Sequence, residues 1–150
     1  MHRAMLKRTS TAVWQGNGLE GQGKLDMQSG AFKAQPYSFK TRFASEDGKA
    51  GTNPEELLAA SHAGCFAMAT SFALTGAGHV PEELKVSAVV SMDKDGEGFK
   101  ITGIHLDLEG KVPGVDAAKF TAIAEEAKKG CPISKALAAT PITLSAKLLG

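Results

Sequence analysis

One long apolar segment near the middle of the chain constrains the fold more than any other feature. Asn53 is a good helix N-cap and Pro54 suits the first helical position, so a helix is predicted to begin here and to run to about Thr75. Between Leu57 and Leu74 the residues are apolar or small on every face of such a helix. A helix of this kind is expected to be buried all round.

The same segment resembles a membrane span, which needs roughly 20 consecutive apolar residues. Polar side chains interrupt the run at Ser61, His62, Thr70 and Ser71, and its many alanines lower its hydrophobicity. We therefore expect no membrane partner. The segment is predicted to be a soluble central helix, wrapped by its own sheet or by a second subunit.

Strand and helix signals surround this helix on both sides. The segments that read as strands are Lys7–Gln15, Lys24–Met27, Pro36–Phe43, Leu84–Asp93, Phe99–Leu108 and Ile142–Leu148. The first two are predicted to form a hairpin, and the fourth and fifth an antiparallel pair. Asp116 is expected to cap a second helix, and Cys131-Pro132 to begin a short third helix that ends near Ala139. This order predicts the α+β class with an antiparallel sheet.

Length and charge limit the classes of function. A chain of 150 residues fits a single domain, residues 1–150, that can bury its own core. Its 17 basic and 16 acidic side chains nearly cancel to a formal net charge of +1, so no nucleic-acid partner is expected. The N-terminal residues lack the apolar run of a secretory signal, which predicts a cytoplasmic protein. Two cysteines in a reducing compartment are more often free, redox-active or metal-bound than joined in a permanent structural disulfide.

The two cysteines differ in their local surroundings. Cys65 lies near the middle of the apolar helix, where a free cysteine is more often a small core residue than a nucleophile. Cys131 follows Gly130 and precedes Pro132, which places its thiol at the positive end of a helix and favours the thiolate. Helix physics alone therefore predicts that Cys131 is the more acidic thiol.

Three further side chains are candidates for influencing Cys65. Sequence spacing cannot place Arg42 relative to Cys65. Glu55 precedes Cys65 by ten residues, about 15 Å along an ideal helix, so it cannot touch the thiol directly. His62 lies three residues before Cys65 on a neighbouring face, where both a Cys–His pair and a packing histidine remain open.

Cofactor and metal motifs are weak in this chain. Glycines beginning at Gly16 match G-x-G-x-x-G, but no helix follows them, so no dinucleotide cofactor is expected. Cys65, Cys131 and His62 are enough ligands for a zinc ion with one open position, although no close ligand spacing supports such a site. A zinc site, or a non-enzymatic dimeric module with two inert thiols, therefore remains an alternative.

Two segments together resemble a known family. Residues Gly51–Phe66 (GTNPEELLAASHAGCF) and Gly130–Ser134 (GCPIS) are similar to the two signature segments of the OsmC/Ohr family of thiol peroxidases. The similarity extends over nearly the whole chain, and Pro36–Phe43 is more similar to the osmotically inducible protein C branch than to the organic hydroperoxide resistance branch. The resemblance implies an intertwined α+β homodimer, with antiparallel sheets around long buried central helices and two active sites at the interface.

The resemblance also implies a role for each candidate residue. Cys65 would attack the peroxide, and Cys131 would condense with the resulting sulfenic acid to form a disulfide. Arg42 would stabilise the Cys65 thiolate, and Glu55 would orient Arg42, so Glu55 need not reach sulfur. The substrate would be an organic hydroperoxide or hydrogen peroxide, and the reductant a dithiol of the lipoyl type. No cofactor or metal is implied.

Overall fold

The first of two compact units ends at Pro54 and is built on a three-stranded sheet. The computed structural model describes residues 5–150. Strand β1 (Ser10–Gln15) pairs antiparallel with β2 (Gln22–Met27), which pairs antiparallel with β3 (Gln35–Tyr37). The predicted N-terminal hairpin is therefore confirmed, with strands that differ by a few residues from the expected bounds.

A short helix, α1 (Phe39–Phe43), follows β3 in this unit. The prediction of a strand over residues 36–43 is therefore wrong for its second half. The reason is a capping box: the Ser38 hydroxyl accepts from the Thr41 N–H at 3.3 Å, and the Thr41 hydroxyl accepts from the Ser38 N–H at 2.9 Å. These reciprocal bonds satisfy backbone donors at the start of a helix and so compete successfully with the strand pattern.

The second unit, from Glu55 onward, contains the other three-stranded sheet, in the order β4-β5-β6. Strands β4 (Glu83–Asp95) and β5 (Gly98–Lys111) are antiparallel, as predicted. Strand β6 (Ile142–Leu148) has its predicted bounds but runs parallel to β5, so the expectation of a purely antiparallel sheet is wrong. The intervening helices return the chain to the level of Ile104 on β5, from which β6 runs in the same direction, as a parallel pair requires.

Three helices accompany this sheet. Helix α2 (Pro54–Gly76) starts at the predicted proline. Helix α3 (Ala117–Gly130) begins after Asp116, whose side chain accepts from the Lys119 N–H at 2.8 Å, as expected of an N-cap. Helix α4 (Pro132–Ala136) also starts as predicted but ends earlier than expected.

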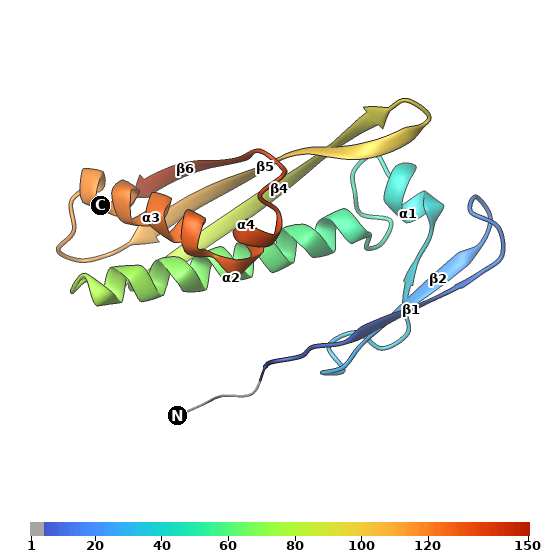
Figure 1. The fold of residues 1–150 in the computed structure, drawn as a ribbon, viewed down its shortest axis with the longest axis horizontal. Helices are drawn as coiled ribbons and strands as arrows, with labels where there is room; N and C mark the ends of the chain where they lie inside the picture. Colours follow the sequence, from blue (N-terminus) through green and yellow to red (C-terminus); the bar gives the residue numbers. More distant parts are fainter. Residues whose placement is uncertain (1–4) are drawn as a thin grey trace. The chain divides into compact units, whose positions relative to one another are not determined.

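The core of the second unit lies between β5 and two helices. Alternate residues of β5 pack with the buried stripes of α2 and α3, so both helices cover the same face of the sheet (Figure 1). The buried apolar residues of this core are Phe66, Leu74, Ile104, Leu106, Leu108, Val112, Val115, Phe120, Ala124, Ala127 and Cys131. The architecture is therefore α+β, as predicted.

Burial of α2 differs from the prediction. Only His62, Phe66, Thr70 and Leu74, one residue every four, are buried within the chain. Met68 is 64% exposed and Phe72 is 73% exposed. The expectation of a helix buried all round is wrong for the single chain, because its own sheet covers one stripe only. By length and composition α2 could also cross a membrane, a property that core helices of soluble proteins share.

Candidate functional site

The two cysteines meet at the junction of three helices. Cys65 projects from α2, and Cys131 is both the last cap of α3 and the N-cap of α4. Their Sγ atoms lie 2.8 Å apart, and both residues are free cysteines. Cys131 is fully buried, whereas Cys65 is partly exposed. The two sulfurs are close enough to form a disulfide with little movement of the backbone.

Backbone donors of α4 are directed at both sulfurs. The N–H group of Ile133 donates to Cys65 and to Cys131, and the N–H of Ser134 also donates to Cys131. These groups have no partner inside the helix because they belong to its first turn, and Pro132 at the first position has no N–H of its own. The local sequence thus supplies hydrogen bonds that stabilise a thiolate.

These contacts separate the acidities of the two thiols. Burial raises the pKa of Cys65, and the hydrogen bond with Cys131 raises it further. Burial opposes ionisation of Cys131 as well, but its hydrogen bonds with Cys65, Ser134 and Ile133 lower the pKa of Cys131 overall. The titrations of two thiols in contact are coupled. Of the two cysteines, Cys131 has the more acidic thiol, as its helix position predicted.

His62 and Ser134 form a second buried contact beside the thiols. His62 Nε2 lies 2.8 Å from Ser134 Oγ, and the two residues are 0% and 7% exposed. Burial lowers the pKa of His62, so its imidazole is neutral near pH 7. The hydroxyl of Ser134 also hydrogen-bonds Cys131. His62 is thus linked to the thiol of Cys131 through Ser134.

Arg42 belongs to the first unit, on α1. It is exposed, and its guanidinium lies over the ring of Phe43, 4.9 Å from the ring centroid. A cavity of about 260 Å³ opens beside it, with aromatic walls from residues of β1, β3 and α1. The residues that line this cavity are Trp14, Gly18, Tyr37, Ser38, Phe39, Arg42 and Phe43. Arg42 is therefore a cation at the edge of an aromatic pocket.

Glu55 lies in the first turn of α2, beside Glu56. It is partly buried, and it is ten residues before Cys65 on the same helix. An acidic side chain in the first turn is stabilised by the positive end of the helix, which accounts for its presence locally. The helix itself keeps this carboxylate away from the thiols, as the spacing predicted.

Comparison with known proteins identifies the family. A family model described as OsmC-like protein matches residues 46–147. Peroxiredoxin OsmC of Escherichia coli (strain K12) is 46% identical over 143 residues, which cover 95% of this chain and 97% of that protein. The chain belongs to the OsmC-like family. The organic hydroperoxide resistance protein OhrA of Bacillus subtilis is 39% identical over a shorter stretch, 57% of this chain and 59% of that protein, so the resemblance to the OsmC branch is confirmed.

Solved structures agree with this assignment. The organic hydroperoxide resistance protein OhrB of Bacillus subtilis superposes on this OsmC-like chain with a TM-score of 0.69 and 26% identity, over 94% of this chain and 98% of that one. An OsmC-like protein from Mycoplasma pneumoniae gives a TM-score of 0.75 at 15% identity, over 97% and 99% of the two chains. The second likeness, at that identity, shows the shared fold.

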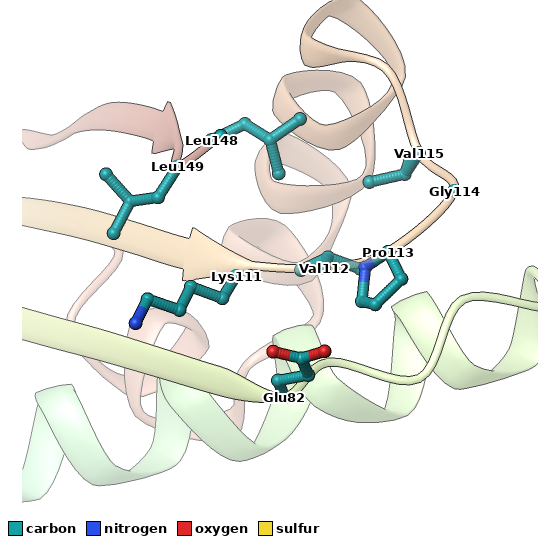
Figure 2. A pocket seen from close by; sticks show the side chains of 9 residues that line it. Glu82, Lys111, Val112, Pro113, Gly114, Val115, Leu148 and Leu149 are labelled. Atoms are coloured by element: carbon teal, nitrogen blue, oxygen red, sulfur yellow. The ribbon is translucent and has the colours of Figure 1, made fainter.

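The second unit of this OsmC-like chain has another cavity. Its volume is about 560 Å³, and Figure 2 shows its walls at the C-terminal ends of β5 and β6. The residues that line it are Glu82, Lys111, Val112, Pro113, Gly114, Val115, Leu148, Leu149 and Gly150. Neither cysteine contributes to it, so we place the candidate site at the thiols.

The zinc alternative finds no support in the arrangement of side chains. Among residues 5–150, no three His, Cys, Asp or Glu side chains gather in a way that could hold a metal ion. Cys65 and Cys131 are together, but His62 directs Nε2 to Ser134. Sequence reasoning gave Ser134 no role. Its signal was the spacing, since residue 134 follows the helix N-cap at 131 by three positions, within one turn.

Proposed function

We propose that this protein is a thiol peroxidase that reduces organic hydroperoxides, and hydrogen peroxide as well, through Cys65 and Cys131. The observation that carries the proposal is the contact between two free thiols, 2.8 Å apart, one partly exposed and one buried. Its relatives are named peroxiredoxin OsmC and organic hydroperoxide resistance protein. A dithiol in contact, in a chain of this family, is suited to two-electron reduction of peroxide.

The proposed cycle has three steps. The Cys65 thiolate attacks one peroxide oxygen, the O–O bond breaks, and an alcohol or water leaves after taking up a proton. Cys131 then attacks the sulfur of the Cys65 sulfenic acid, forming the disulfide and releasing water. An external dithiol reduces this disulfide and returns both thiols. Cys65 takes the first role because it is the partly exposed cysteine, while Cys131 is fully buried.

Arg42 and Glu55 complete the proposed catalytic set. Burial and Cys131 both raise the pKa of Cys65, so a cation is needed to favour the thiolate at this position. We assign that role to Arg42, whose guanidinium also suits an anionic or polar peroxide oxygen. Glu55 is assigned the role of orienting Arg42, since a carboxylate pairs well with a guanidinium fork.

The pocket beside Arg42 supports an organic substrate. Its walls include the aromatic side chains of Trp14, Tyr37 and Phe39, which favour an apolar alkyl or aryl group. Arg42 at the same pocket offers a polar anchor for the peroxide end. A hydroperoxide with an apolar body therefore matches this lining better than hydrogen peroxide does.

The proposal includes a homodimer in the cytoplasm, in which residues 1–150 act as one domain. Met68 and Phe72 of α2 are mostly exposed in the single chain. The small residues Ala60 and Gly64 continue the exposed face and allow close approach of a second helix. A second copy of the chain, rather than a membrane, is proposed to cover this face. The reductant is proposed to be a lipoyl-type dithiol.

Titration of the reduced protein with an organic hydroperoxide tests the function. A peroxidase of this type loses two thiols per chain for each equivalent of peroxide and yields a disulfide between Cys65 and Cys131. Reduced lipoamide is expected to restore the thiols and to sustain turnover, and glutathione to do so more slowly. Retention of both thiols would instead identify a binding module with inert cysteines. Full turnover after treatment with a chelator would exclude the zinc alternative.

A further inference from the structure

A chain of hydrogen bonds in the second unit links His62, through Ser134, to the two thiols. His62 Nε2 lies 2.8 Å from Ser134 Oγ, although the two residues are 72 positions apart in the chain. The Ser134 hydroxyl hydrogen-bonds Cys131, whose Sγ lies 2.8 Å from that of Cys65. Three of the four residues are buried, and only Cys65 is partly exposed. The mechanism proposed above uses the two cysteines and assigns no role to His62 or Ser134.

Of the two ring nitrogens of His62, Nε2 belongs to this hydrogen-bond chain and Nδ1 does not. Nδ1 is buried and has no hydrogen-bond partner among the residues that the structure describes. A buried polar atom without a partner costs free energy, so packing alone does not explain why histidine occupies this position. Because burial lowers its pKa, His62 is neutral and carries a single N–H.

Ionisation of Cys131 decides which nitrogen carries that proton. A thiolate accepts hydrogen bonds and donates none, and the Ser134 hydroxyl has one proton to donate. When Cys131 is a thiolate, that proton must point to sulfur, so the oxygen of Ser134 can only accept from His62. The proton of His62 is therefore on Nε2, and Nδ1, the nitrogen left without a partner, carries a lone pair rather than an unsatisfied N–H.

We propose that His62 is a positioning residue for Cys131: its Nε2–H donates to Ser134 Oγ and thereby holds the Ser134 hydroxyl proton on the Cys131 sulfur that resolves the sulfenic acid. The sulfenic acid step rests on the proposed function. The effect itself concerns how fast Cys131 attacks the sulfur of Cys65 in any mixed disulfide or sulfenic acid, so it can be measured separately. His62 acts here as a fixed neutral donor and keeps its proton throughout the cycle.

The step that the pair assists is balanced without any further reactant. The Cys131 thiolate attacks the sulfur of the Cys65 sulfenic acid, the S–S bond forms, and the S–O bond breaks. Hydroxide leaves and takes up the proton that Cys131 released on ionisation, so the products are a disulfide and water. A hydroxyl held on the attacking sulfur raises its thiolate fraction, and this gain exceeds the accompanying loss of intrinsic nucleophilicity.

A chromogenic aromatic disulfide, dithiobis-nitrobenzoate, tests the proposal without peroxide. Cys65 attacks this disulfide and releases one nitrothiobenzoate, and the mixed disulfide forms on Cys65. Cys131 then attacks the mixed disulfide and releases the second nitrothiobenzoate. The first release depends on reagent concentration, and the second does not. Cys131→Ser gives only the first. The rate of the second release therefore reports the resolving power of Cys131 even if the protein proves not to be a peroxidase.

Two variants remove different members of the hydrogen-bond chain. Ser134→Ala and His62→Leu are each expected to slow the second release roughly three- to tenfold, since a hydrogen bond to a charged group is lost but partly offset by higher nucleophilicity. In a Cys65→Ser background the thiolate absorbance of Cys131 at neutral pH should fall in both. His62→Gln, which can also donate through its amide nitrogen, is expected to recover the rate and the absorbance.

Matched controls separate this role from stability. His105 Nδ1 lies 2.6 Å from Thr143 Oγ1, a second histidine–hydroxyl pair on β5 and β6 away from the thiols. Thr143→Ala and His105→Leu should leave the second release unchanged. An unchanged second release in Ser134→Ala, a small substitution that the fold should tolerate, would overturn the proposal. So would a folded His62→Gln variant as slow as His62→Leu, because packing rather than hydrogen-bond donation would then explain the effect.

Discussion

Cys65 and Cys131 lie 66 positions apart in the chain, yet their sulfur atoms are 2.8 Å apart. Helix α2 carries the first, and the junction of α3 and α4 carries the second. In this arrangement the buried residue, Cys131, has the more acidic thiol, while the partly exposed residue is Cys65. Acidity and access therefore favour different cysteines for the first attack, and the division of labour is the most informative property to test.

Single-cysteine variants are expected to show that Cys65 attacks first. Cys131→Ser should react with one equivalent of hydroperoxide, accumulate sulfenic acid on Cys65 and then pass to the sulfinic form with excess oxidant. Cys65→Ser should be nearly inert, because Cys131 is fully buried. Mass spectrometry of the oxidised variants locates the modification. Sulfenic acid on Cys131 of Cys65→Ser, with Cys65 unmodified in Cys131→Ser, would reverse the assignment.

Arg42→Ala is expected to slow the oxidation of Cys65 by roughly tenfold or more at neutral pH. In the proposed site Arg42 favours the Cys65 thiolate, and a cation that lowers the pKa of a thiol by about one unit raises its thiolate fraction about tenfold. Stopped-flow measurement of the second-order rate with an organic hydroperoxide checks it. Lys40→Ala is the matched control, since Lys40 is a cation on the same short helix. Equal rates for both variants would remove Arg42 from the mechanism.

Phe72→Glu is expected to convert the proposed dimer to monomers. The side chain is 73% exposed in the single chain, and a charge in an interface between apolar helix faces has no partner. Light scattering with size-exclusion chromatography measures the mass directly. Val89→Glu changes another exposed apolar residue, 56% exposed on β4, and should leave the mass unchanged. A wild-type monomer would contradict the proposed assembly itself.

The stability of the protein is expected to fall as the pH falls below the ordinary histidine pKa of 6.5, in part because of His62. Burial lowers the pKa of His62 in the folded state, so the unfolded chain binds its proton first and gains free energy on acidification. The contribution is at most about 1.4 kcal/mol per pH unit. Urea unfolding across this pH range should show a shallower dependence of the free energy of unfolding on pH in His62→Gln than in the wild type.

Gly110→Ala is expected to destabilise the protein by about 1–3 kcal/mol, since an overpacked core must shift. A Cβ at this position of β5 would lie 2.7 Å from the ring of Phe120 and 3.0 Å from a methyl of Leu84. Gly103→Ala, on the same strand, would meet nothing closer than 3.7 Å and should change the free energy of unfolding by no more than about 0.5 kcal/mol. Equal midpoints in thermal unfolding would contradict this account of the core.

Most elements of the fold follow from signals between residues close in the chain. The proline at the start of α2, the Asp116 cap of α3 and the alternating residues of β4 and β5 give these elements within a few residues of their observed bounds. Helix caps and strand alternation involve neighbours, so the sequence contains them directly. The family resemblance rests on two segments that are likewise read directly from the sequence, Gly51–Phe66 and Gly130–Ser134. The roles of Cys65, Cys131, Arg42 and Glu55 that it implies stay predictions.

Other properties depend on which segments meet, and local signals do not specify that. The parallel pairing of β6 with β5 follows from the path of α3 and α4 across the sheet. The burial of a single stripe of α2 depends on which face of the helix meets the sheet, and apolar residues on every face do not show which face is covered. The alignment of His62, Ser134 and the two thiols brings together atoms from separate helices, and only tertiary packing sets such distances. The sequence by itself therefore determined the elements and the chemistry available, and the folded structure decided which of those groups are in contact.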